Sequence, residues 1–362
     1  MGLAGRVLAR RSSRLSPSER QDSCVVSHLS LPVLGLLSQC ERVIQGEISV
    51  AAKMKLYLKK RSGKFLDACE VADECTVEDF KQHFYRKYHY YPERQWWTVG
   101  QPQGPALRGE GLLTNFGVHD GDTLFFKDLG VQISWRLVFV LEYLGPLLIF
   151  PALYFFPSIF YGENNAPSKC LTQTVALWLC VGHFIKRELE TLFVHRFSNS
   201  TMPIVRVPLN CGHYWLLCGV SIGYFLFHPK YQAPFEGDWQ FMIYILTALF
   251  VVFEALNFKT HLILRNLRSR GTRQRGIPYG AGFDLVSCAN YYWETLTWLV
   301  FAVLVSCFTA WLFLVVAFGQ MAEWALKKHR NYLKEFKEYP NSTVRILQEP
   351  QGYYTISSLK VN

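Results

Sequence analysis

The sequence contains little charge. Only 18% of its 362 residues are Asp, Glu, Lys or Arg, whereas a soluble domain carries roughly 25%. Half of the residues are hydrophobic and 15% are aromatic. This composition excludes an intrinsically disordered chain, a collagen and a coiled coil. The mean hydropathy is only +0.08, which indicates a polar part joined to a strongly apolar one.

Several motifs of metal and cofactor sites are also absent. The 10 cysteines include no CxxC pair and indicate neither a disulfide framework nor a zinc site. No GxGxxG or P-loop motif occurs, so a Rossmann or Walker nucleotide site is not indicated. No HxxxH pair occurs, which weakens a histidine-rich di-iron enzyme. We therefore expect no metal and no flavin.

The net charge of +10 is compatible with several anionic partners. Nucleic acid, anionic lipid, phosphorylated cofactors and coenzyme A all fit a basic protein. In this chain the basic residues cluster between apolar runs. That arrangement favours membrane lipid and phosphate ligands, and we expect no nucleic-acid partner.

The first 128 residues are predicted to form an extension and a small α/β domain. Residues 1–53 are rich in Arg and Ser, which fits either a targeting-like segment or an extension without a structural role. Within 54–128, MKLYLKK alternates apolar and polar residues and turns at Ser62-Gly63-Lys64, which predicts a hairpin. Thr76 and Asp79 have the spacing of a helix capping box. The strands QWWTV and GDTLFF complete an order that resembles ubiquitin and favours a docking module.

From residue 131 to residue 340 the chain is predicted to be an all-α membrane bundle. Apolar runs occur near 134–156, 171–185, 211–228, 239–256, 283–304 and 305–322. Since a spanning helix needs about 20 apolar residues, we expect about six spans, with five to seven allowed, the last two forming a tight hairpin. The loops after the second, fourth and sixth runs are basic, which places both termini in the cytosol.

Some polar residues lie inside these apolar runs, where they are costly and usually face a cavity or a partner. Glu142 and the pair Asn290 and Glu294 are predicted to face a polar cavity, because a spacing of four puts the pair on one helix face. Lys186 and Glu190 have the same spacing and could pair. Glu254 fits an interface contact equally well.

Three motifs give the chain a specific resemblance. GHFIKRELETLFVHRFS, LVSCANYYWETLTW and WALKKHRNYLKEFKEYP together resemble the very-long-chain trans-2-enoyl-CoA reductases of the steroid 5α-reductase superfamily. The resemblance spans about residues 54–340. It implies a multi-pass enzyme of the endoplasmic reticulum membrane that uses NADPH in the last step of fatty-acid elongation. The implied partners are a long-chain enoyl-CoA, membrane lipid and other elongation enzymes.

The same resemblance implies roles for individual residues. Tyr291 matches the family's catalytic Tyr, and the neighbouring Tyr292 is predicted to point about 100° away on the helix. The other positions associated with catalysis are Glu142, Lys186 and Glu190. The positions expected to bind the cofactor are Asn257, Arg268, Asn290, Glu294, His329, Arg330 and Tyr332.

Three departures keep other functions open. Phe184 stands where relatives often have Tyr, Ala289 stands where they have Pro, and residues 341–362 form a divergent tail. A reductase of a steroid or polyprenal enone keeps the fold and changes the substrate. A catalytically silent membrane scaffold of the elongation complex is the alternative from another class.

Overall fold

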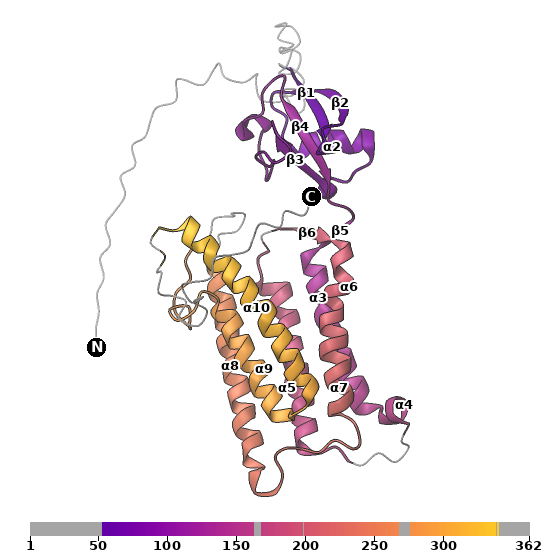
Figure 1. Cartoon of the computed structure of the whole chain (residues 1–362), viewed down its shortest axis with the longest axis vertical. Helices are drawn as coiled ribbons and strands as arrows, with labels where there is room; N and C mark the ends of the chain where they lie inside the picture. Colours follow the sequence, from indigo (N-terminus) through magenta and orange to yellow (C-terminus); the bar gives the residue numbers. More distant parts are fainter. Residues whose placement is uncertain (1–52, 163–167, 198, 268–275, 338, 340–362) are drawn as a thin grey trace, which may run out of the picture. The chain divides into compact units, whose positions relative to one another are not determined.

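The computed structural model describes residues 53–162, 168–197, 199–267, 276–337 and 339. A β-rich part comes first and a helical part follows it (Figure 1). Three features of the sequence prediction lie outside the described residues: the extension up to residue 52, the tail at 341–362 and Arg268.

The β-rich part begins with the predicted hairpin. Strand β1 (Lys53–Lys60) pairs antiparallel with β2 (Phe65–Ala72). Gly63 in the turn has φ +89°, a conformation that strains any residue with a side chain. Buried and exposed residues alternate along β1, as in a strand with one face on a core. The buried side chains of β1 are Met54, Leu56 and Leu58.

Helix α2 (Val77–Tyr88) begins with the predicted capping box. The Asp79 N–H donates to Thr76 Oγ1 at 3.1 Å, and the Thr76 N–H donates to Asp79 Oδ2 at 3.3 Å. The Thr76 hydroxyl also donates to this carboxylate and holds the pKa of Asp79 below its ordinary value. With β3 (Gln95–Val99) and β4 (Thr123–Asp128), the sheet order is β2-β1-β4-β3.

The helical part contains a helical segment at each predicted apolar run. It is not all-α as predicted, because β5 (Gln132–Ser134) pairs antiparallel with β6 (Thr201–Pro203) in a short sheet. The helices are α3 (Trp135–Phe155), α4 (Pro157–Tyr161), α5 (Leu171–Leu189), α6 (Val207–Gly212), α7 (Ser221–Leu226), α8 (Phe241–Asn266), α9 (Ala289–Val305) and α10 (Phe308–Glu335). A π-helical stretch, His213–Val220, joins α6 to α7.

Three stretches of the described chain are long and apolar enough to cross a membrane: α3, Gly237–Asn266 and α10. Helix α8 packs along α9, and α3 packs along α5 (Figure 1). Only Ser306 and Cys307 separate α9 from α10, so the predicted tight hairpin is confirmed.

Two predicted boundaries are wrong. The basic segment after the second run is not a loop, because α5 runs to Leu189 and a π-helical turn continues to Val194. Lys186, Arg187 and Glu190 of this segment have ion-pair partners inside the bundle. The fifth run begins at residue 283, but α9 begins only at Ala289. The left-handed backbone of Gly280 to Gly282, with φ between +50° and +96°, precedes a series of turns there.

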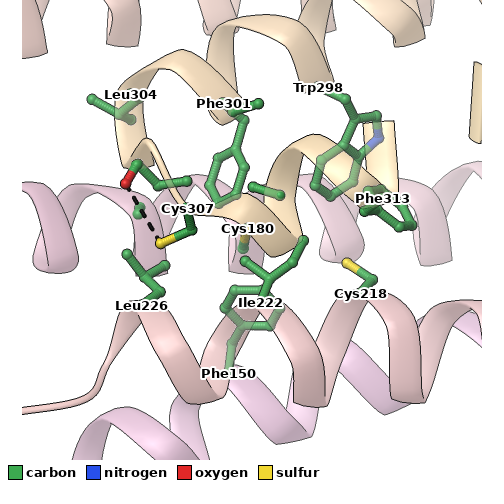
Figure 2. Packing of buried hydrophobic residues seen from close by; sticks show 14 of the residues in the cluster. Phe150, Cys180, Cys218, Ile222, Leu226, Trp298, Phe301, Leu304, Cys307 and Phe313 are labelled. Atoms are coloured by element: carbon green, nitrogen blue, oxygen red, sulfur yellow. Dashed lines mark hydrogen bonds between the residues drawn. The ribbon is translucent and has the colours of Figure 1, made fainter. Parts of the chain in front are cut away.

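Aromatic rings from different helices form the centre of the hydrophobic core (Figure 2). The rings of Trp298 on α9 and Phe313 on α10 meet edge to face, with centroids 4.6 Å apart. Cys180 and Cys218 are buried beside them. The cysteines in the described part of the chain are free thiols, and these two act as small hydrophobes, as expected.

A close contact between α3 and the π-helical stretch gives the first testable prediction. A β-carbon built on Gly145 would lie 2.0 Å from Cδ1 of Trp215, whose indole N–H donates to the Leu141 carbonyl at 2.8 Å. Gly145→Ala should therefore displace the indole and destabilise the protein by about 1–3 kcal/mol. Thermal unfolding in detergent measures the effect. Gly182→Ala in α5 is the matched control, because its β-carbon meets open space; equal midpoints for the two variants would contradict the prediction.

Candidate active site

Lys186 is the centre of a polar network inside the bundle. Its Nζ lies 2.8 Å from Glu254 Oε2 and donates to Asn257 Oδ1 at 2.5 Å. The predicted pair with Glu190 is present at 3.4 Å. Glu254 is therefore the nearer carboxylate, and it forms an ion pair within this network. These contacts join α5 to α8.

Arg187 joins the same network to α3. Its Nη1 donates to Glu190 Oε2 at 2.6 Å, and its Nη2 donates to the Tyr143 hydroxyl at 2.8 Å. Both partners are only 1% exposed. His261 Nδ1 lies 3.0 Å from the other oxygen of Glu190. A carboxylate buried this deeply needs such partners, because desolvation is costly for a lone charge.

Asn257 links the network to the start of α9. Its amide nitrogen donates to the Asn290 carbonyl at 2.9 Å and to Glu294 Oε2 at 3.1 Å. His183 lies between two acids, 2.8 Å from Glu254 and 3.5 Å from Glu294. Asn257 therefore contacts the backbone of Asn290 and the side chain of Glu294, and the polar cavity expected at this pair stays a prediction.

Glu142 occupies a polar position on α3. The side chain is only 2% exposed, and its carboxylate accepts a hydrogen bond from Asn210 Nδ2 at 2.9 Å. The next residue, Tyr143, is the one that Arg187 contacts. Glu142 is thus adjacent in sequence to Tyr143, which is part of the network.

A cavity of about 180 Å³ lies between the first turns of α9 and the second half of α10. Tyr291 lines it, as does Tyr292, so the predicted angle of about 100° between the two side chains does not keep Tyr292 out of the cavity. The reason is the spacing of the α9 residues that line the cavity. Cys288, Tyr291, Tyr292 and Thr295 follow the i, i+3, i+4, i+7 pattern of one helix face, which includes two adjacent residues.

The three predicted residues of α10 occupy different environments. His329 lines the cavity, and its Nδ1 lies 2.9 Å from Ser287 Oγ. Tyr332 is buried, with its ring 5.2 Å from that of Tyr339. Arg330 is exposed. Of these three residues, His329 therefore lines the cavity, Tyr332 packs in the core and Arg330 presents its charge at the surface.

The comparisons with known proteins follow this geometry. The 3-oxo-5-alpha-steroid 4-dehydrogenase family matches residues 200–347. A very-long-chain enoyl-CoA reductase of Dictyostelium discoideum is 39% identical over 293 residues, which cover 79% of this chain and 95% of the relative. The chain belongs to the very-long-chain enoyl-CoA reductase family.

Two further similarities have lower sequence identity. A human trans-2,3-enoyl-CoA reductase-like protein is 32% identical over 280 residues, which cover 75% of this chain and 76% of that protein. Among solved structures, a protein designed from ubiquitin is 18% identical and covers 21% of this chain and 88% of its own. Its TM-score of 0.18 carries no conclusion about the fold of the β-rich part.

The Asn290 side chain bears on whether the site can hold a nicotinamide cofactor. Asn290 is 8% exposed, and its side-chain Oδ1 is buried without a hydrogen-bond partner in the described part of the chain. A buried acceptor of this kind is costly unless a ligand donates to it. The amide N–H₂ of a nicotinamide is such a donor, so the residues present fit the cofactor.

Glu190, His195 and His261 have the spacing of metal ligands, with ligand atoms within 4.8 Å of one another. Burial lowers the pKa of His195 to about 3, and the positive charge of Arg187 contributes, so this imidazole is neutral at pH 7. The Glu190 carboxylate, however, already contacts Arg187 and Lys186. These two cations oppose a metal ion, and we interpret the cluster as part of the ion-pair network.

Sequence analysis missed four residues of the network: Tyr143, His183, Arg187 and His261. Two signals were available. Glu254, Asn257 and His261 have the spacing i, i+3, i+7, which places them on one face of α8. Arg187 lies within the same short motif as Lys186 and is three residues before Glu190, a spacing that allows a helical ion pair.

Proposed function

We propose that this chain reduces trans-2-enoyl-CoA to saturated acyl-CoA with NADPH, in the last step of very-long-chain fatty-acid elongation. The chain is an oxidoreductase that acts on a CH–CH group. The observation that carries the proposal is the cavity that Tyr291 lines. The preceding residue, Asn290, has the buried acceptor, and its carbonyl is bonded to the charged network through Asn257. A hydroxyl, a polar cofactor contact and an apolar wall are what conjugate reduction of an acyl thioester requires.

The chemistry assigns one role to the cofactor and several to the chain. Bound NADPH would supply the hydride that adds to C3 of the enoyl thioester. Negative charge then develops on the thioester oxygen, and a hydrogen-bond donor there lowers the barrier. C2 must also receive a proton from a positioned acid. The Tyr291 hydroxyl is the group proposed for this chemistry, with Tyr292 on the same cavity face as its competitor.

The cofactor contacts are proposed at two places. Asn290 Oδ1 would accept from the nicotinamide amide, and Asn257 and Glu294 would hold that turn of α9 in position through the bonds described above. The remaining proposed cofactor residues are Arg268, His329, Arg330 and Tyr332. Arginine suits the phosphates because its guanidinium binds them through two parallel hydrogen bonds.

The proposed surroundings follow from the charge pattern. A six-span bundle in the endoplasmic reticulum membrane with cytosolic termini would place the coenzyme A phosphates near the basic segments. The acyl chain would extend among the helices towards Glu142, and Lys186 and Glu190 are the further positions proposed for catalysis. A ubiquitin-like domain at 54–128 would serve as a docking module for other elongation enzymes.

The test is NADPH oxidation by the purified full-length protein in detergent, with three substrates in parallel. We expect turnover of a long-chain trans-2-enoyl-CoA and none of a steroid enone or of the saturated acyl-CoA. Turnover of the steroid alone would contradict the proposal and favour the steroid reductases. NADPH binding without turnover of any of these substrates would also contradict the proposal. Loss of both NADPH binding and turnover would favour a silent scaffold.

A further inference from the structure

Three side chains form a hydrogen-bonded chain at the edge of the cavity. The Tyr339 hydroxyl donates to Ser287 Oγ at 2.8 Å, and Ser287 Oγ lies 2.9 Å from His329 Nδ1. Ser287 and Tyr339 are 7% and 6% exposed, so bulk water does not replace these bonds. Ser287 and His329 line the cavity together with Tyr291. Neither Ser287 nor Tyr339 has a role in the function proposed above.

The direction of the hydrogen bonds fixes where the protons lie. Because Tyr339 donates to Ser287, the serine keeps its own hydrogen for a second bond. Within the described part of the chain, the acceptor beside Ser287 Oγ is His329 Nδ1. A buried hydroxyl hydrogen without an acceptor is costly, so Ser287 donates to this nitrogen. Nδ1 is then unprotonated, and the neutral imidazole carries its hydrogen on Nε2.

We propose that Tyr339 and Ser287 are positioning residues that hold His329 in its Nε2–H tautomer. His329 thereby presents one N–H donor to an acceptor oxygen of the ligand in the cavity. The ligand part of this proposal rests on the proposed reductase function, since that oxygen belongs either to the cofactor or to the acyl thioester. The tautomer itself depends only on the three side chains.

The first test is nitrogen NMR of the full-length protein labelled with ¹⁵N-histidine, without ligand. The His329 signals are identified by their loss in His329→Gln. We expect Nδ1 to be unprotonated and Nε2 protonated, and we expect Tyr339→Phe and Ser287→Ala each to add a population with Nδ1 protonated. A wild-type spectrum with a proton on Nδ1 would overturn the proposal. So would a tautomer that neither substitution changes.

Tyr161→Phe is the matched control. Its hydroxyl donates to the Tyr224 carbonyl at 3.0 Å and takes no part in the chain of three residues. It removes the same single oxygen from a tyrosine, so the tautomer of His329 should stay as in the wild type. Because these spectra need no turnover, a failure of the reductase proposal leaves them fully interpretable.

The second test separates the two sources of the acceptor oxygen. Loss of one hydrogen bond should raise KM by about threefold to tenfold, for NADPH if the cofactor supplies the oxygen and for enoyl-CoA if the thioester does. His329→Gln keeps an N–H near the position of Nε2, whereas the shorter amide of His329→Asn lies near Nδ1. We expect Gln to restore KM better than Asn. Equal defects in the two variants would contradict the donor role of Nε2.

Discussion

Tyr291→Phe should lower kcat for trans-2-enoyl-CoA reduction by about 10²- to 10⁴-fold, the usual contribution of a positioned general acid. The substitution removes one oxygen and keeps the ring, which is 6.2 Å from that of Trp324 on α10. Packing of the cavity should therefore survive. The measurement is NADPH oxidation at saturating substrate, together with NADPH binding to show that the cofactor site is intact.

Tyr292→Phe is the decisive comparison, because both tyrosines line the same cavity on the same helix. We expect this second variant to keep most of the wild-type kcat. If Tyr292→Phe loses activity and Tyr291→Phe retains it, the roles of the two residues are reversed. If both retain activity, the proton comes from another group.

Arg187→Met should destabilise the protein by about 3–5 kcal/mol, the cost of removing one partner from a buried ion pair. The Arg187 side chain is 14% exposed and the Glu190 side chain 1%, so water does not replace the lost guanidinium. Loss of the bond to the Tyr143 hydroxyl adds a second buried group without its partner. Thermal unfolding in detergent measures the change.

Two further variants show whether burial causes this effect. The double variant Arg187→Met with Glu190→Gln should be more stable than Arg187→Met alone, because the carboxylate left without Arg187 is then neutral. Lys327→Met breaks an exposed pair with Glu323, in which the side chains are 63% and 57% exposed. That variant should unfold at the wild-type midpoint, since exposed ion pairs contribute little. A midpoint as low as that of Arg187→Met would contradict the argument.

Local signals predicted the elements of this protein well. The Thr76–Asp79 spacing predicted a capping box that the structure contains, and alternation in β1 predicted which of its residues are buried. Apolar runs also predicted where the helices lie. A capping box, a strand and a helix all depend on residues that are close in sequence, so local patterns can reveal them. Three stretches of the described chain are long and apolar enough to cross a membrane. The predicted total of about six crossings stays a prediction.

The site was harder to predict, because its contacts join distant parts of the chain. Lys186 and Glu254 are 68 residues apart, so no spacing rule connects them. Charge counting treated the segment around Lys186 as a basic loop, whereas Lys186 has an acidic partner on a packed helix and Arg187 has one on the next turn. The ranking of Tyr291 above Tyr292 stays a prediction. One helix face can include two adjacent residues, and an angle of 100° between Tyr291 and Tyr292 does not exclude either.

The short turn at Ser306 and Cys307 has a mechanical consequence. Helices α9 and α10 are joined there, while the cavity lies near their other ends. At 1.5 Å per residue, Tyr291 is about 22 Å from the turn. A change of about 3° in the angle between the two helices thus moves the cavity walls by about 1 Å, because the displacement grows with distance from the turn. Leu304 and Ala310 are packed close to the turn, so we expect substitutions there to change the width of the cavity and, under the proposed function, the fit of the substrate.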